Sequence, residues 1–374
     1  MAQGKASGPL TGVRIIEFLG IGPGPYACML LSDMGADVVT LARQGQWQND
    51  ARQFVNRGRT VVELDLKNPA HIQQALELLA NADALIEGFR PGVMERLGLG
   101  PDVALKRNPR LVYGRMTGWG QEGPLAQAAG HDINYIAITG ALDSFRAPDG
   151  ALVSPLNLVG DYGGGAMFLV VGVLAGIIEA RSSGKGQVVD AAMCDGVSSM
   201  LTMFHALKAT GRWTDQAGTN LLDGGAHFYR PYKCKDGRYF SLGAIEPQFY
   251  AELRKLAGLE DEAFNPQMSR DKWPELRAKM EAIFLTKTCA EWTKILEGSD
   301  ACAAPVVGLF EAPNHPHLAA RKTFVKDEGG VQPAPAPRFS RTLSAIQHSA
   351  AVSPVSASDV LSRWGNKTPS RASA

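Results

Sequence analysis

The sequence predicts an α/β fold in which a large Rossmann-like domain is accompanied by a smaller α+β domain. Three observations support this prediction. The chain of 374 residues exceeds the usual size of a single domain. Its first half alternates short β-branched runs with helical stretches, which is typical of a parallel sheet with crossover helices. From about residue 225 the pattern changes to two short strands followed by helices.

The first half begins with a strand, turn, helix and strand unit. Residues 13–19 form a β-branched run, a turn rich in glycine and proline follows, and a helical stretch reaches Met34 before the second apolar run at residues 36–41. Because such a unit closes by a crossover, the two strands are expected to be parallel. Further along, the same patterns predict a helix over residues 67–82 and strands over residues 84–87 and 110–116.

The second half predicts a separate small domain and a return of the chain to the first. Residues 228–242 read as two strands around a Lys-Asp-Gly turn, and residues 332–338 are a proline-rich, extended connector. Residues 344–364 are then expected to pack on the first domain as a strand and a helix. We therefore expect a discontinuous large domain of residues 1–200 and 328–374, a linker of residues 201–224, and a small domain of residues 225–327.

Charge and cysteine content narrow the possible partners. The 38 Lys and Arg residues balance 37 Asp and Glu residues, so neither nucleic acid nor an anionic membrane is favoured as a partner. The five cysteines are odd in number and widely spaced, which argues against a disulfide framework and a metal site and favours the cytoplasm. The longest apolar stretch, residues 163–178, is short and glycine-rich for a bilayer span and is expected to be a buried helix.

The turn after the first strand does not match a dinucleotide-binding fingerprint. Pro25 occupies the third glycine position, and Arg43 follows the second strand where an acidic residue would hold a ribose. Together with Arg90 and Arg96, which follow later strand ends or helix starts, Arg43 suits a ligand that carries several phosphates. For each of the three, the alternative is an ordinary surface arginine with a buried stem.

Two polar residues in glycine-rich settings suggest an acid/base site. His131 follows Gly130, and its neighbours Asp132 and Asn134 are able to orient and polarise an imidazole. Asp161 precedes a glycine run and an apolar helix. The alternatives are a helix-start histidine satisfied by backbone groups and an aspartate that caps a helix. Bases on two faces of one carbon are what proton removal and return require.

Two further features extend this site. Gly163 and Gly164 are poor helix formers, so their bare N–H groups are expected to face a ligand oxygen, as an oxyanion hole does. Glu246 lies between Ile245 and Pro247, an apolar setting that suggests a functional carboxylate, whereas the alternative is a solvated loop residue.

At these residues the chain resembles the α-methylacyl-CoA racemases, which are members of the family III CoA-transferase superfamily, and bacterial racemases in particular. The resemblance runs over nearly the whole chain. It is carried by residues 20–25, 116–120, 130–135, 156–161, 183–190, 222–226 and 243–250.

The resemblance implies a reaction and a set of roles. His131 and Asp161 would be the paired bases that interconvert the (2R) and (2S) forms of a 2-methylacyl-CoA through an enolate, with Glu246 supporting the histidine side and no metal or organic cofactor. The chains would form an interlocked homodimer. The positions that match CoA contacts are Ile21, Arg43, Leu64, Leu66, Arg90 and Arg96.

Two other functions remain open at this point. In CoA-transferases related to these racemases, the aspartate that matches Asp161 is a nucleophile, and the place of His131 usually carries another residue. A protein that only binds CoA would keep the arginines and glycine loops but has no need of both bases. The presence of His131 together with Glu246 favours the racemase.

Overall fold

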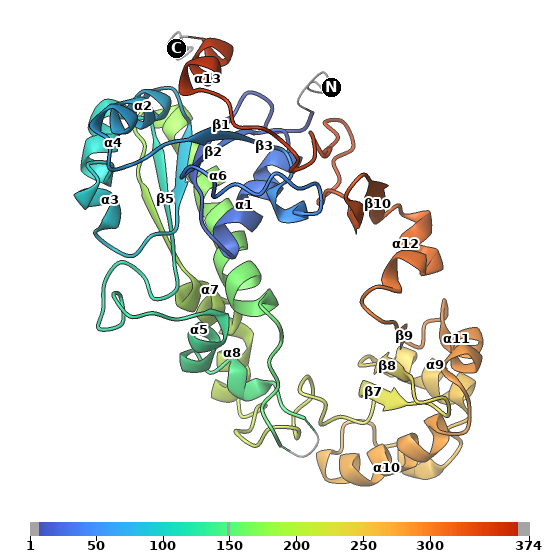
Figure 1. Ribbon diagram of the computed structural model, residues 1–374. Helices are drawn as coiled ribbons and strands as arrows, with labels where there is room; N and C mark the ends of the chain where they lie inside the picture. The colour runs from blue at the N-terminus through green and yellow to red at the C-terminus, as the bar shows by residue number, and fades with distance from the viewer. Residues whose placement is uncertain (1–6, 148–149, 366–374) are drawn as a thin grey trace. The chain divides into compact units, whose positions relative to one another are not determined.

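The computed structural model describes residues 7–147 and 150–365, which form two compact units, each with its own hydrophobic core (Figure 1). The ends of the predicted large domain, residues 1–6 and 366–374, lie outside the described residues. The first unit comprises the described residues up to Ala141, residues 155–201 and those from Lys322 onward. The second comprises the described residues within 142–154 and residues 202–321.

The first unit is built on a parallel sheet. Among the described residues, this sheet has six strands in the order β3-β2-β1-β4-β5-β6, and every neighbouring pair is parallel. This is the strand order of a doubly wound dinucleotide-binding fold, so the predicted α/β, Rossmann-like architecture is confirmed. The strands are β1 (Arg14–Phe18), β2 (Asp37–Ala42), β3 (Arg59–Glu63), β4 (Ala84–Glu87), β5 (Val112–Thr117) and β6 (Val188–Ala192).

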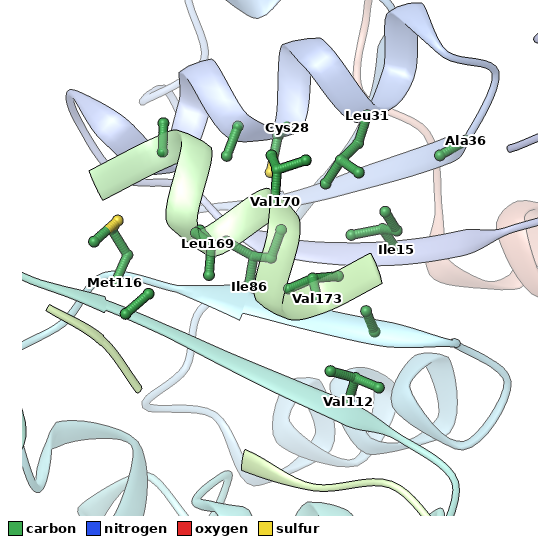
Figure 2. Packing of buried hydrophobic residues seen from close by; sticks show 14 of the residues in the cluster. Ile15, Cys28, Leu31, Ala36, Ile86, Val112, Met116, Leu169, Val170 and Val173 are labelled. Carbon is green, nitrogen blue, oxygen red and sulfur yellow. The ribbon is translucent and has the colours of Figure 1, made fainter. Parts of the chain in front are cut away.

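Helices cover both faces of this sheet. On one face, helix α6 (Phe168–Ser183) packs Leu169, Val170 and Val173 among side chains of the sheet and of α1 (Pro23–Asp33) (Figure 2). The other face is closed by α2, α4 and the carboxyl-terminal α13, which share a second cluster of buried side chains. Burial of apolar area on both faces is the main source of stability of such a sheet. The helices are α1 (Pro23–Asp33), α2 (Pro69–Ala80), α3 (Val93–Arg96), α4 (Pro101–Arg107), α5 (Asp132–Ile138), α6 (Phe168–Ser183), α7 (Met193–Met200) and α13 (Ala357–Trp364), with a 3₁₀ turn η1 (Phe54–Asn56).

The apolar stretch predicted at residues 163–178 is part of a longer helical segment. A π-helix, η3 (Leu158–Met167), runs directly into α6, so that the segment Leu158–Ser183 has 26 residues. Excluding a bilayer span on length was therefore wrong: by length and composition alone this segment is able to cross a membrane. Half of its most apolar part is buried, in keeping with the predicted core helix, which passes the same test.

The second unit combines a small antiparallel sheet with helices. Strands β7 and β8 flank the predicted Lys-Asp-Gly turn, and β9 pairs with β8. Aromatic side chains from strands and helices fill its core, including Phe228, Phe284 and Trp292. The elements are η2 (Leu142–Ser144), α8 (Thr202–Ala209), β7 (Tyr229–Lys233), β8 (Tyr239–Gly243), α9 (Pro247–Ala257), η4 (Glu262–Phe264), η5 (Arg270–Lys272), α10 (Trp273–Phe284), α11 (Cys289–Leu296), β9 (Ala303–Val306), η6 (Ala312–Asn314) and α12 (Pro316–Ala320).

The division into units differs from the predicted boundaries. A linker was expected over residues 201–224, but residues 202–224 belong to the second unit: they begin with helix α8 and continue into a loop, where Arg277 donates to the carbonyl oxygens of Gly218 and Gly225. The chain rejoins the first unit at Lys322 rather than residue 328, because the hairpin of β10 (Phe324–Asp327) and β11 (Gly330–Pro333) is anchored there by Arg57. The boundary thus follows side-chain contacts that no local pattern indicates.

A buried histidine of the second unit predicts acid sensitivity. His227 is fully buried, and its Nε2 lies 2.7 Å from the Tyr250 hydroxyl. Desolvation by burial lowers the pKa of His227 to about 4, with a further lowering by Arg277. An unfolded chain therefore binds a proton at this residue between about pH 6.5 and 4 that the folded unit does not bind, so stability is lost as pH falls through this window.

We expect this residue to contribute about 3 kcal/mol to the loss of unfolding free energy between pH 7 and pH 4. Chemical denaturation at several pH values gives the unfolding free energy of the wild type and of His227→Gln as a function of pH. The contribution of His227 is the difference between the slopes of these two curves. Gln keeps a donor for Tyr250 and does not titrate. Parallel slopes in the two proteins would contradict the prediction.

Candidate active site

A cavity of about 690 Å³ opens at the carboxyl ends of β1, β4 and β5. The last residue of each of these strands forms part of the cavity wall, namely Phe18, Glu87 and Thr117. In an open α/β sheet, ligands bind beyond the carboxyl ends of the strands where the strand order reverses, which here is between β1 and β4. His131 and Asp161 both line this cavity.

Asp161 lies inside the π-helix η3 and not at a helix cap. Its half-buried carboxylate accepts a hydrogen bond of 3.1 Å from the side-chain amide of Asn157. Desolvation raises the pKa of Asp161; the bond from Asn157 opposes this rise, the Asp132 carboxylate adds to it and His131 opposes it. A carboxyl group with a raised pKa is able to hold a proton part of the time, as a catalytic acid must.

Asp132 holds the backbone of Asp161 and makes no hydrogen bond to the imidazole of His131 in the described residues. Its Oδ2 accepts from the Asp161 N–H at 2.7 Å, and a Cβ on Gly160 would lie only 2.5 Å from that oxygen. Asp132 was expected to orient the imidazole of His131, but in the structure its carboxylate binds the backbone N–H of Asp161 instead. Adjacent residues at a helix start point in different directions, so Asp132 turns inward while His131 faces the cavity.

His131 occupies the N-cap position of α5. Its backbone N–H donates to Oδ1 of Asn134 at 3.0 Å, and its side chain is exposed at the cavity wall. The preceding residue is also fixed, because the Tyr135 hydroxyl donates to the Gly130 carbonyl. The backbone is therefore held by Asn134 and Tyr135, while the imidazole stays open to a ligand.

Replacing Asp132 by Asn is expected to lower the pKa of Asp161, since it removes a negative charge and keeps an oxygen for the Asp161 N–H. For the reaction predicted from the sequence, in the direction in which Asp161 would donate a proton, the rate should fall as pH rises through this pKa. That fall should move to lower pH by up to about 1 unit in Asp132→Asn. A pH–rate profile for each enantiomer measures it, and an unshifted profile would exclude an electrostatic role for Asp132.

Gly163 and Gly164 do not line the cavity. A Cβ on Gly164 would lie 2.5 Å from the Val197 side chain and 2.8 Å from its backbone nitrogen, and one on Gly163 would meet Met200 at 3.3 Å. Inside a π-helix, backbone N–H groups bond within the helix. These glycines therefore permit close packing of η3 on α7, and the predicted oxyanion hole is not formed by them.

The predicted CoA contacts divide into two groups. Ile21 and Arg90 line the cavity, and the Ile21 side chain is 81% exposed. The others line neither this cavity nor the neighbouring one of about 430 Å³, which shares the turn of residues 20–25. Arg43 and Arg96 are exposed after β2 and at the end of α3, while Leu64 is buried and Leu66 partly buried against the core of the second sheet face.

Glu246 belongs to the second unit, where it is the N-cap residue of α9. Its carbonyl oxygen accepts from the N–H of Tyr250 at 2.9 Å, and its carboxylate is exposed. The Glu246 side chain thus has the solvated surroundings that were the alternative to the predicted apolar setting. Its support of His131 stays a prediction.

Three cavity residues escaped the prediction. Asn157 precedes Asp161 by four residues, a spacing at which helical side chains meet, and this signal was available in the sequence. A Cβ on Gly22, at φ +68°, would lie 3.0 Å from the Asp161 carboxylate, so only glycine fits this turn. Glu87 is a buried carboxylate at the end of β4, and the sequence gives no sign that it borders a cavity.

The family model described as CoA-transferase family III matches residues 10–355. The chain belongs to this family. It is 43% identical over 334 residues to a mouse protein named alpha-methylacyl-CoA racemase, covering 89% of this chain and 87% of that protein. The human protein of the same name is 40% identical over the same shares. A hypothetical protein from Mycobacterium tuberculosis has a similar structure, with a TM-score of 0.79, 27% identity, and coverage of 95% of this chain and 98% of that one.

Within residues 7–147 and 150–365, no group of three or more His, Cys, Asp and Glu side chains is placed to hold a metal ion. That the reaction needs no cofactor stays a prediction.

Proposed function

We propose that this protein interconverts the (2R) and (2S) forms of 2-methylacyl-CoA thioesters. The observation that carries the proposal is that the imidazole of His131 and the carboxyl group of Asp161, whose pKa burial raises, line one cavity. The 40–43% identity to mouse and human proteins named as racemases supports this reaction over acyl transfer. Asp161 would also be the nucleophile in a transferase, so His131 distinguishes the two chemistries.

In the proposed mechanism, neutral His131 removes the α-proton from one face of the thioester. The electron pair passes to the thioester oxygen as an enolate, and protonated Asp161 returns a proton to the α-carbon on the opposite face. The roles reverse for the other enantiomer. Burial favours the protonated form of Asp161, and the Asn157 amide fixes the carboxyl group while it gains and loses a proton.

The test is to incubate the protein with one enantiomer of a 2-methylacyl-CoA in deuterated water and to follow the α-position by proton NMR. Loss of the α-proton signal together with appearance of the other enantiomer would support the proposal. If no exchange occurs but thioester appears on an added free carboxylate, the protein is a CoA-transferase that uses Asp161 as its nucleophile.

We also propose that the chain acts as a homodimer, interlocked as the family resemblance implies. Support comes from α6, whose solvent side carries an apolar stripe of Phe168, Val171 and Ile178, the last two being 63% and 69% exposed. An apolar stripe of this kind is typical of a covered interface. Light scattering should give a dimer mass for the wild type and a monomer mass for Val171→Glu/Ile178→Glu; a monomeric wild type would rule the dimer out.

A reducing compartment such as the cytoplasm is the proposed location, and metabolism of branched fatty acyl groups the proposed context. All five cysteines are free thiols, and Cys28, Cys234 and Cys289 are buried. Fractionation of cells that express the chain tests the location; recovery from a secreted or membrane fraction would contradict it.

A further inference from the structure

A buried ion cluster lies beside the cavity and takes no part in the proton transfers proposed above. Arg115 of β5 stands opposite Glu87 of β4 in the sheet, and its Nε donates to Glu87 at 3.0 Å. The other end of the guanidinium reaches Glu95 of α3, with Nη1 2.9 Å from Oε1. Arg115 and Glu87 are 7% and 1% exposed, whereas the Glu95 side chain is 44% exposed.

This cluster attaches both ends of the loop of residues 88–92, which joins β4 to α3 and borders the cavity, to the sheet. The second carboxylate oxygen of Glu87 accepts from the N–H of Phe89 at 2.8 Å, which fixes the start of the loop, and Glu95 fixes its end. Between these points lies Arg90, exposed and on the cavity wall. In the middle of the loop, the Gln127 amide donates to the Pro91 carbonyl at 3.1 Å.

The charges of the cluster make its bonds interdependent. Burial raises the pKa of Glu87 to about 7, while the N–H of Phe89 and the Arg115 guanidinium oppose that rise. Asp190 of β6 also stands opposite Arg115, and the Tyr113 ring lies 5.8 Å from its guanidinium carbon. Because a buried guanidinium is stable only with its partners in place, Arg115 has one favourable position, and that position defines the loop.

We propose that Arg115 is a positioning residue which, through Glu87 and Glu95, sets the loop so that Arg90 binds a phosphate group of the acyl-CoA. The proposal rests on the proposed function, because it requires a CoA thioester as substrate. Arg90 is suited to this contact by its exposed, always charged guanidinium at the cavity wall. Arg115, being buried, acts only through its two carboxylate partners.

The experiment compares the wild type, Glu95→Ala, Arg90→Ala and the double variant on two substrates, a 2-methylacyl-CoA and the same acyl group on pantetheine. Glu95 is the residue to change because its side chain is partly exposed and its removal leaves no buried charge without a partner, whereas loss of Arg115 would strand Glu87. Glu77→Ala, an exposed glutamate of α2, is the matched control.

Glu95→Ala should raise KM for the CoA ester about tenfold, leave kcat unchanged and leave KM for the pantetheine ester unchanged, since one charge-assisted contact is lost. Adding Glu95→Ala to Arg90→Ala should then have little further effect. The proposal would be overturned if Glu95→Ala raised KM equally for both esters, lowered only kcat, or left KM for the CoA ester unchanged. It would also be overturned if the effects of Glu95→Ala and Arg90→Ala on KM were additive. A wild type that exchanges no α-proton refutes the proposed function instead.

Discussion

His131→Ala is expected to lower the rate of interconversion by about 1,000-fold, within the range that a single general acid or base contributes. The cavity wall is otherwise intact, because the backbone of His131 is held by Asn134, so the affinity for CoA should be nearly unchanged. The measurement combines chiral analysis of the thioester with calorimetric titration of CoA.

Exchange of the α-proton with deuterated water, measured for each enantiomer separately, tests the two bases one at a time. With His131 absent, Asp161 still faces one side of the α-carbon, so one enantiomer should exchange its α-proton with deuterated water without inversion. Asp161→Asn should show the opposite preference. His317→Ala, at an exposed histidine of the second unit, is the control. A large loss of CoA binding in His131→Ala, or exchange of both enantiomers in either variant, would contradict a two-base site.

Gly196→Ala is expected to destabilise the first unit by about 3 kcal/mol or more. A Cβ on Gly196 of α7 would lie 1.9 Å from the carbonyl oxygen of Gly164 in η3, so one of the two backbones must shift. Chemical denaturation measures the loss. Because η3 carries Asp161, activity should fall at temperatures where the variant is still folded.

The matched control for this variant is Gly24→Ala. Gly24 lies in the first turn of α1, and a Cβ added there would have no atom of the surrounding structure within 4 Å. Alanine at this position should change stability by no more than about 1 kcal/mol, and in the favourable direction. If Gly196→Ala were as stable as Gly24→Ala, the close approach of α7 to η3 would not be a constraint on this fold.

Local patterns were enough for the sheet and its crossovers. The strand predicted over residues 84–87 coincides with β4 (Ala84–Glu87), and the unit from β1 to β2 is parallel as expected. Both follow from short, mainly apolar runs bounded by turns, a local pattern that is typical of buried strands. Prediction was weaker at the glycines of residues 163–165, which were expected at a helix start and lie inside the π-helix η3.

The need for glycine inside the π-helix η3 could not be predicted, because the residues that demand it lie elsewhere in the chain. A Cβ on Gly164 would meet Val197 of α7, thirty-three residues later, and this close approach exists only after α7 packs on η3. The same limit applies to Leu64, whose burial depends on α2 and α13. The type of a residue such as glycine or leucine does not by itself indicate which distant elements will pack against it.

The fold class, the family and the two residues proposed to exchange protons, His131 and Asp161, follow from the amino-acid sequence alone, because strand periodicity and motif residues are local properties. The surroundings of these two residues depend on how the chain packs. Packing turned Asp132 toward the backbone of Asp161, brought Asn157 to its carboxylate, and linked Glu87, Arg115 and Glu95 beside the cavity. The direction of a side chain and the burial of a charge depend on elements distant in sequence, so they are fixed only when those elements pack.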